Sequence, residues 1–291
     1  MILVTGATGT NGKELIRQLT AAGQRVRAFV RDAAKAESLK GEQVELAEGN
    51  FDQVESLHSA LQGVEKAFLL VPVAEQFPGW QTAFIEIAKH AGVRHLVKFS
   101  GMGAAAGQTA GELLRLHGET DEFLRRSGLP FTILQPNSFH QNILGSLSTI
   151  NGHGVFYWPM KDAAQSTVDV RDINAVATKV LTTPGHEGQT YVITGPAAPT
   201  FDQAADVLSR VLNRTIRYVP VSSDAAADSM RKAGLPEWNI RAVCGLLDYC
   251  ASGAASRVTD TVSRLLGRPA ISFEQFVQDH QSFFTPSVPS P

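Results

Sequence analysis

The chain has 291 residues, of which 43% are hydrophobic and 19% charged, and its formal net charge is −2. These values are ordinary for a soluble globular protein, and without a long run of lysine or arginine they exclude the basic surface of a nucleic-acid binder. No stretch reaches the roughly 20 apolar residues of a membrane span and no secretory signal pattern precedes the first strand, so the expected location is the cytoplasm.

The first half of the chain alternates strand-like apolar runs with segments of helical periodicity. The expected strands are 2–5, 25–30, 44–46, 67–71, 95–99 and 131–134. The expected helices are 12–22, 54–61, 80–91 and 111–126. This alternation predicts βαβ units in a parallel sheet, and the nearly continuous apolar strands predict helices on both of its faces.

Single glycines separate the expected helices from the strands that follow. They are Gly23, Gly63, Gly92 and Gly128. Glycine readily takes the left-handed conformation that ends a helix. The repeated pattern therefore supports the βα alternation.

The second half of the chain is less regular. We expect strands at 155–158, 191–194 and 216–219, helices at 201–212 and 225–233, and a loop at 195–199. We predict an α/β protein with a doubly wound Rossmann sheet over 1–150 and a smaller C-terminal α/β lobe over 151–284, interleaved with the sheet. The proline-rich tail 285–291 is expected to be disordered.

A glycine-rich motif lies between the first strand and the first helix. Its glycines are Gly6, Gly9 and Gly12. In a dinucleotide-binding turn, the first glycine permits a sharp bend, the second permits close approach of a diphosphate, and the third permits tight helix packing. The helix start presents unpaired N–H groups to the phosphates. Further donors are expected from Thr8, Thr10 and Asn11. The motif predicts a site for NAD(P).

The end of the second strand reads Val30-Arg31-Asp32, with Lys35 close behind. The Arg31 guanidinium suits a 2′-phosphate, and Lys35 would add positive charge. Asp32 suits instead the ribose hydroxyls of NAD. The decision depends on where the strand ends, and all three side chains can also be merely solvated. We favour NADP(H) over NAD(H).

The chain resembles the NmrA-like group of atypical short-chain dehydrogenase/reductases. The resemblance covers nearly the whole chain and rests on motifs in a fixed order. These motifs are TGATGxxG at 5–12, VRD at 30–32 with Lys35, GNFD at 49–52, KFS at 98–100, SGLPFTILQP at 127–136, VDVRDI at 168–173, LGRP at 266–269 and SFEQF at 272–276.

This resemblance implies a Rossmann domain and a smaller lobe with a cleft between them. It implies that Asp52 lies near the adenine, that Val71 and Pro72 end the fourth strand against the cofactor, and that Ser100 and the stretch Pro136–Phe139 lie near the nicotinamide. Some members of the group are NADPH-dependent reductases of quinones, azo compounds or triphenylmethane dyes. Others are regulators that bind the dinucleotide and catalyse little.

The usual catalytic pair of short-chain dehydrogenases is missing. Where that pair places tyrosine and lysine four residues apart, this chain has His117 and Asp121. His117 can serve as a proton donor because imidazole titrates near neutrality, or it can be a surface histidine weakly paired with an acid. Alternatively, no protein acid is needed, because hydride attack on a quinone or cationic dye gives a product that water can protonate. The candidate catalytic residues are Ser100 and His117.

Aromatic and polar residues after the sixth strand are candidates for the substrate slot. We rank Phe139 and Asn142 first, and His140 is a further candidate. An aromatic wall can come from Phe156, Tyr157 and Trp158, or from Phe77 and Trp80, although plain core packing is an alternative for each. Neither the scattered histidines nor the two cysteines, Cys244 and Cys250, indicate a metal site.

We therefore expect an NADPH-dependent reductase that transfers hydride to a quinone-like, azo or dye-type acceptor. The alternative is a non-catalytic NADP(H)-binding redox sensor. A nucleotide-sugar epimerase or dehydratase ranks last, because such enzymes normally keep the tyrosine and lysine. The expected partner is a small aromatic or quinoid substrate, without nucleic acid or membrane, and a homodimer is allowed.

Overall fold

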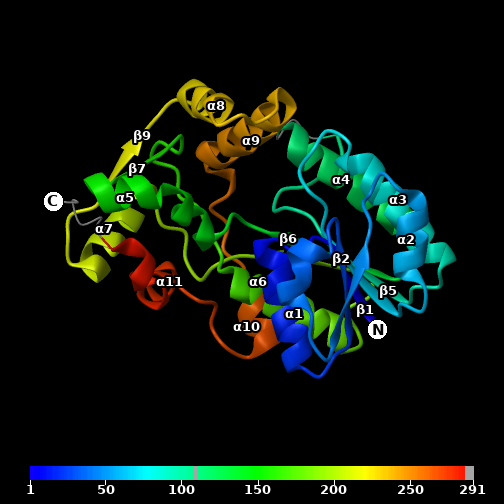
Figure 1. Cartoon of the computed structure of the whole chain (residues 1–291). Coiled ribbons are helices and arrows are strands. Elements are labelled where there is room, and N and C mark those ends of the chain that lie inside the picture. Colours follow the sequence, from blue (N-terminus) through cyan, green and yellow to red (C-terminus); the bar gives the residue numbers. More distant parts are fainter. Residues whose placement is uncertain (108–110, 286–291) are drawn as a thin grey trace. The chain divides into compact units, whose positions relative to one another are not determined.

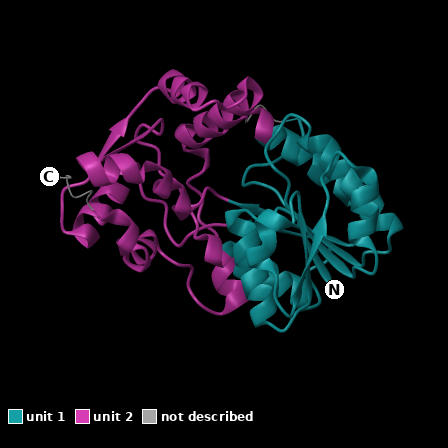
Figure 2. Cartoon of the chain, viewed as in Figure 1, with its two compact units in different colours: residues 1–108, 114–136, 173–192 teal, residues 109–113, 137–172, 193–291 magenta. Residues whose placement is uncertain are grey.

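The computed structural model describes residues 1–107 and 111–285 of the chain. Its contacts divide the chain into two compact units, shown in teal and magenta in Figure 2. Unit 1 comprises Met1–Gln108, Leu114–Pro136 and Ile173–Val192. Unit 2 comprises Thr109–Leu113, Asn137–Asp172 and Ile193–Pro291. By this division the chain returns to the first unit twice, at Leu114 and at Ile173, before it ends in the second.

Unit 1 is built on a seven-stranded sheet with the order β3-β2-β1-β4-β5-β6-β8. The strands are β1 (Ile2–Val4), β2 (Val26–Val30), β3 (Val44–Glu48), β4 (Lys66–Leu69), β5 (His95–Phe99), β6 (Phe131–Pro136) and β8 (Gln189–Ile193). Neighbouring strands from β3 to β6 pair in parallel. The strand order reverses between β1 and β4, and ligands of such sheets bind beyond the carboxyl ends of the strands at this point.

Helices cover both faces of this sheet. They are α1 (Thr10–Ala21), α2 (Val54–Leu61), α3 (Phe77–His90), α4 (Glu112–Arg126) and α6 (Val170–Thr182), with a short 3₁₀ turn, η1 (Ala34–Leu39). Figure 1 shows α2, α3 and α4 together on one face and α1 and α6 on the other. The sheet is therefore doubly wound, as predicted. All four glycines expected to end helices have a positive φ, between 69° and 78°.

Unit 2 combines a small sheet with several helices. Its parallel strands β7 (Val155–Trp158) and β9 (Arg217–Pro220) pair with each other. The helices are η2 (His140–Ser146), α5 (Leu147–His153), α7 (Phe201–Leu212), α8 (Ser223–Lys232), α9 (Glu237–Tyr249), η3 (Cys250–Ala254), α10 (Thr261–Leu266), α11 (Phe273–Asp279) and η4 (Gln281–Phe284). Phe156, Leu208 and Phe276 are fully buried at the centre of its core. A Thr200 capping box starts α7.

Several parts of the second half differ from the sequence-based expectation. The helices η2, α5, α6, α9, α10 and α11 were not predicted as elements. The predicted disordered tail lies outside the described residues apart from Thr285. Unit 1 gives way to unit 2 at residue 136 rather than 150 and regains 173–192; the predicted division into two domains stays a prediction. Both cysteines are free, and no described helix has the length and apolarity needed to cross a membrane.

Candidate functional site

The glycine motif forms a tight turn at the carboxyl end of β1. Gly6 has a φ of +63°, which favours glycine, and its carbonyl accepts a 3.0 Å hydrogen bond from the Gly9 amide. A Cβ on Gly12 would lie 2.2 Å from the Gly6 carbonyl oxygen. A Cβ on Gly9 would meet that oxygen only at 3.4 Å. The structure therefore requires glycine at positions 6 and 12, whereas position 9 is left open toward solvent.

The amino end of α1 lies directly behind this turn. Its N-cap is Gly9, which offers no side chain to the first helical N–H groups. These groups and the helix dipole favour an anion such as a diphosphate. Thr8 and Thr10 are exposed beside them, as a ligand-binding role requires. Asn11 is buried instead, and its Oδ1 accepts a 3.1 Å hydrogen bond from Asn174 of α6, so it holds two helices together.

The turn is fastened to the segment that follows β4. The Thr5 hydroxyl lies 2.8 Å from both the carbonyl oxygen and the amide nitrogen of Leu70. This contact places the two strand ends at the reversal of strand order side by side. Val71 is buried and Pro72 exposed just beyond β4, which ends two residues earlier than predicted. Their role as cofactor contacts stays a prediction.

The end of β2 favours Arg31 over Asp32 as the ribose-side residue. The strand ends at Val30, so Arg31 is the first residue beyond it, and its side chain is exposed. No ion pair or hydrogen bond of its guanidinium occurs within 1–107 and 111–285. Asp32, by contrast, accepts the Lys35 amide at 3.2 Å and pairs with the Lys35 ammonium at 3.1 Å. Lys35 is thus engaged with Asp32, which leaves Arg31 as the available group for a phosphate.

Asp52 belongs to an aromatic corner formed with α3. Its Oδ1 accepts a 2.8 Å hydrogen bond from the Trp80 indole, and that indole stacks on Phe51 with ring centroids 5.9 Å apart. Phe51 also packs edge-on against Phe29 of β2. Trp80 therefore holds Asp52 in place rather than lining a substrate slot, and Phe77 is buried in the core.

The predicted catalytic Ser100 belongs to a buried polar cluster. Asp121 of α4 accepts from the Lys98 ammonium at 2.6 Å, from the Ser100 hydroxyl at 2.8 Å and from the Gln135 amide at 3.2 Å. Lys98 and Asp121 are almost completely inaccessible to solvent. Burial lowers the pKa of the Lys98 ammonium, and the Asp121 carboxylate opposes that shift. Because the Ser100 hydroxyl donates its proton to Asp121, it can accept from a ligand but is not free to protonate one.

The segment after β5 is tied to the end of β6. The Ser100 amide donates to the Leu134 carbonyl at 2.8 Å, and the Met102 amide donates to the Pro136 carbonyl at 2.9 Å. Pro136 is buried at the last position of β6. The backbone around Ser100 and Pro136 is therefore rigidly placed at the carboxyl edge of the sheet.

The surroundings of His117 fit neither expectation, the proton donor or the surface histidine paired with an acid. Its supposed partner Asp121 is bound to Lys98, and the His117 ring lies against Phe77 with centroids 5.0 Å apart. Its Nδ1 is buried and has no hydrogen-bond partner among the described residues. Burial, with Lys98 nearby, lowers the pKa of His117 well below 6.5. The expectation of a surface histidine paired with Asp121 is wrong, and a neutral imidazole is a poor proton donor at neutral pH.

We expect the protein to lose stability between pH 6.5 and 4. Burial lowers the pKa values of His95 and His140 to about 4, compared with 6.5 in the unfolded chain. In this window the unfolded chain binds more protons, so the stability present above pH 6.5 is lost as the pH falls. Each of these two histidines should cost about 2 kcal/mol at pH 5. Asp172, whose pKa burial raises, acts in the opposite sense at the acid end.

Urea unfolding at pH 7.5 and pH 5 measures this loss. His95→Gln is the matched control, because glutamine can still donate to the Thr132 hydroxyl, which lies 2.9 Å from His95 Nε2, but does not titrate. The variant should be less sensitive to pH than the wild type. Equal sensitivity would show that His95 does not contribute.

The substrate candidates after β6 come together in a pocket within unit 2. Phe139 and Asn142 line it, together with Phe156 and Trp158 of β7. The other lining residues are Ser138, His140, Ile143, Gln165, Thr167, Pro199, Thr200, Phe201, Ala204, Leu247 and Phe273. None of them is an acid, lysine or arginine, so the lining of the pocket is uncharged and mainly apolar. Tyr157 points away and is 48% exposed.

His140 serves the structure of this pocket rather than its chemistry. Its Nδ1 lies 2.8 Å from the Thr167 hydroxyl and its Nε2 lies 3.2 Å from the Ile271 carbonyl oxygen. Both ring nitrogens therefore have partners within the protein. The low pKa of about 4 keeps the ring neutral at physiological pH.

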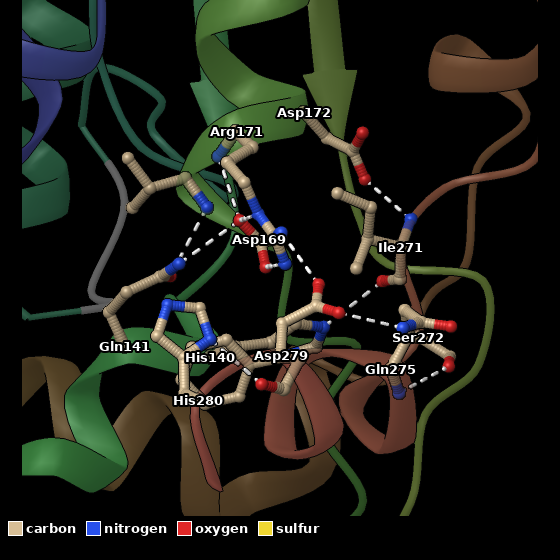
Figure 3. A network of polar contacts seen from close by, with 12 residues as sticks. His140, Gln141, Asp169, Arg171, Asp172, Ile271, Ser272, Gln275, Asp279 and His280 are labelled. Carbon is tan, nitrogen blue, oxygen red and sulfur yellow. Dashed lines mark hydrogen bonds and ion pairs between the residues drawn. The ribbon is translucent and has the colours of Figure 1, made fainter. Parts of the chain in front are cut away.

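A network of polar contacts ties the VDVRDI motif to α11 within unit 2 (Figure 3). Arg171 pairs with Asp169 at 2.7 Å and with Asp279 of α11 at 2.6 Å. Asp172 accepts a 2.6 Å hydrogen bond from the Ile271 amide. The acidic residues of this motif are thus occupied in holding the C-terminal segment, and the motif has a structural role.

Comparison with known proteins places this geometry in a family. The model of the NmrA-like family matches residues 1–244. The chain belongs to the NmrA-like family. This is the family that the sequence motifs had indicated.

Relatives of this NmrA-like chain include named reductases. NAD(P)H azoreductase of Xenophilus azovorans is 38% identical over 284 residues, covering 98% of this chain and 99% of the relative. The structure of the Escherichia coli NADPH-dependent quinone oxidoreductase QOR2 complexed with NADPH has a TM-score of 0.85 and 28% identity, covering 97% and 100% of the two chains. That of Citrobacter sp. triphenylmethane reductase complexed with NADP(H) has a TM-score of 0.84 and 27% identity, covering 96% and 99%.

Sequence reasoning missed part of the cluster in this NmrA-like protein. Lys98 interrupts the apolar strand at 95–99, and such a lysine in a fully buried strand is a signal of a buried partner. Gln135 gives a similar signal in β6. Gly118 also went unnoticed, although a Cβ there would lie 2.1 Å from the Ala105 carbonyl carbon. It allows α4 to approach the segment after β5.

Proposed function

We propose that this protein is an NADPH-dependent reductase that transfers hydride to a quinone, azo compound or triphenylmethane dye. The observation that carries the proposal is the start of α1, whose N–H groups lie uncapped behind a turn in which Gly12 cannot be replaced without a clash. The fit is chemical as well as geometric, because such a helix start favours a diphosphate. When bound, the nicotinamide supplies the hydride.

The protein's own residues would bind and orient the two reactants. The turn from Gly6 to Gly12 would bind the diphosphate, Arg31 the 2′-phosphate, and the corner around Asp52 the adenosine end. Val71, Pro72 and Pro136 would border the cofactor, and Ser100 would accept a hydrogen bond from it. The pocket lined by Phe139 and Asn142 would bind the flat acceptor.

The acceptor chemistry needs no protein acid. The buried cluster commits the Ser100 proton to Asp121, and His117 is neutral. Hydride attack on a quinone gives an anion that water can protonate, and hydride attack on a cationic dye gives a neutral product that needs no proton. The protein would mainly contribute proximity and orientation. This account agrees with the absence of the tyrosine and lysine pair from α4.

A turnover measurement distinguishes the proposed reductase from a non-catalytic sensor. The sensor was the alternative suggested by the missing tyrosine and lysine. Purified protein is mixed with NADPH and a panel of quinones, azo compounds and triphenylmethane dyes. We expect NADPH oxidation well above the rate without protein for at least one acceptor. Tight NADPH binding without turnover of any acceptor would favour the sensor. The relatives reported above are reductases, and they favour the first outcome.

Arg31→Ala should weaken NADPH binding far more than NADH binding. Loss of charge-assisted hydrogen bonds to the 2′-phosphate should raise the Kd for NADPH roughly 10- to 100-fold and leave that for NADH nearly unchanged. Titration calorimetry measures both constants. Arg25→Ala is the matched control, because Arg25 is exposed just before the opposite end of β2. Equal effects of Arg31→Ala on the two cofactors would contradict the assignment of NADPH preference.

We also propose that the protein acts in the cytoplasm and without nucleic acid. Its small-molecule partner follows from the proposed reaction. We also propose that the protein can form a homodimer, and sedimentation would test this.

A further inference from the structure

The ends of β2 and β3 bring Arg31 and the segment 49–52 next to each other. Val30 lies opposite Glu48 in this parallel pair, and the Gly49 amide donates a 2.9 Å hydrogen bond to the Val30 carbonyl. Paired strands are about 4.8 Å apart, so the residues that follow them leave the sheet together. A 2′-phosphate and an adenine base are attached to the same ribose. With the phosphate on Arg31, as proposed above, the segment after β3 is the neighbour that can reach the base.

The turn after β3 fixes the backbone of Asp52. The Oδ1 atom of Asn50 accepts a 2.9 Å hydrogen bond from the Asp52 amide, and the Ser56 hydroxyl donates to the Gln53 carbonyl at 2.7 Å. The turn also lies close against the start of α2, because a Cβ on Gly49 would be only 2.5 Å from the Ser56 Cβ. The backbone that carries Asp52 therefore has little freedom to move.

Trp80 of α3 fixes the side chain of Asp52 as well. Its indole N–H donates to Oδ1 at 2.8 Å, and the indole is itself held by stacking on Phe51 with the ring planes at 25°. The indole has one donor, so it binds one carboxylate oxygen and leaves the other to a different partner. Asp52 is exposed, and none of the described residues donates to its second oxygen, Oδ2. The carboxylate therefore offers a ligand one acceptor atom in a fixed orientation.

We propose that Trp80 is a positioning residue that makes the cofactor site select the exocyclic amine of adenine. The Oδ2 atom of Asp52 accepts a hydrogen bond from this amine, which is a donor. In hypoxanthine an oxygen acceptor replaces the amine, and two acceptors then face each other. A mobile carboxylate could turn instead to the ring N–H of hypoxanthine, so the selection depends on Trp80 as well as on Asp52. This inference rests on the proposed reductase function and specifies how its site recognises the cofactor base.

The first test compares NADPH with reduced nicotinamide hypoxanthine dinucleotide phosphate by titration calorimetry. We expect the wild type to bind NADPH about tenfold more tightly, which is the worth of one charge-assisted hydrogen bond at an exposed site. Trp80→Phe keeps a ring against Phe51 but removes the donor, and it should lower this ratio to about twofold. Glu86→Gln is the control, because Glu86 is exposed on the same helix, and it should keep the wild-type ratio.

The second test replaces the carboxylate with an amide of the same shape. In Asp52→Asn the Trp80 N–H must bind the amide oxygen, so the NH₂ group takes the place of Oδ2. A donor then faces the adenine amine, whereas it matches the oxygen of hypoxanthine. This variant should bind the hypoxanthine dinucleotide roughly threefold to tenfold more tightly than NADPH. In Asp52→Asn combined with Trp80→Phe the amide can turn either way, and the two Kd values should be nearly equal.

The reversal and its loss separate positioning from a merely structural role, which would weaken both dinucleotides alike. Urea unfolding checks that each variant is folded. Equal affinities in the wild type, a wild-type ratio in Trp80→Phe, or a reversal that persists without the indole would each overturn the inference and leave the reductase function standing. If the wild type binds neither dinucleotide, the proposed function itself fails.

Discussion

The Gly12→Ala protein should bind NADPH about 100-fold more weakly than the wild type and unfold about 1–3 kcal/mol more easily. The added Cβ would lie 2.2 Å from the Gly6 carbonyl oxygen and 2.6 Å from the Ala7 Cα. Both are backbone atoms, so no side-chain rotation can relieve the overlap. The turn must shift, and the N–H groups at the start of α1 then no longer point at one position.

Gly9→Ala is the matched control for this variant. Its Cβ would make only a 3.4 Å contact with the protein, so the free energy of unfolding should change by less than about 0.5 kcal/mol. NADPH binding should nevertheless weaken, because the methyl group would occupy space that a diphosphate needs. Calorimetry and urea unfolding measure the two effects separately. Wild-type affinity in Gly12→Ala would show that the turn does not bind the cofactor.

Asp121→Ala should lower the free energy of unfolding by about 3–5 kcal/mol. The carboxylate is the common acceptor for Lys98, Ser100 and Gln135, and its removal leaves a fully buried ammonium without a counter-charge. Replacement of both charged residues, as in Lys98→Met with Asp121→Leu, should cost less, because no uncompensated charge stays buried.

Urea unfolding compares these proteins. Glu119→Ala on the same helix is the control, because it breaks only an exposed ion pair with Arg115 and should cost less than about 1 kcal/mol. A double variant less stable than Asp121→Ala would contradict the view that the single variant suffers from an uncompensated charge.

The sequence predicted the Rossmann half closely because its signals are local. Strand β5 and helix α2 have the predicted bounds there, and so do β7 and α7 in unit 2. The glycines at the helix ends and in the turn work through backbone conformation, which a sequence reveals directly. The doubly wound parallel sheet could be predicted from the alternation of strands and helices because βαβ units have few allowed arrangements.

The parts of the fold and of the site that the sequence did not predict depend on contacts between residues far apart in the sequence. Asp121 was expected to pair with His117 four residues away, yet its partner is Lys98, and that choice depends on how α4 packs on β5. The helix α11 is held by Arg171, more than 100 residues earlier. The sequence offered Phe139 and Trp158 as candidates, but Phe201, which lines the same pocket, becomes their neighbour only in the folded chain.

Transfer of a labelled hydride tests the central claim most directly. The protein is incubated with NADPH carrying deuterium at both C4 positions and with a cationic triphenylmethane dye, whose reduced carbon does not exchange hydrogen with water. The product is then examined by mass spectrometry. A hydride-transferring reductase places one deuterium on the central carbon of the dye. A dye that stays unreduced, with the quinones and azo compounds equally untouched while NADPH is bound, or a reduced dye without deuterium, would contradict it.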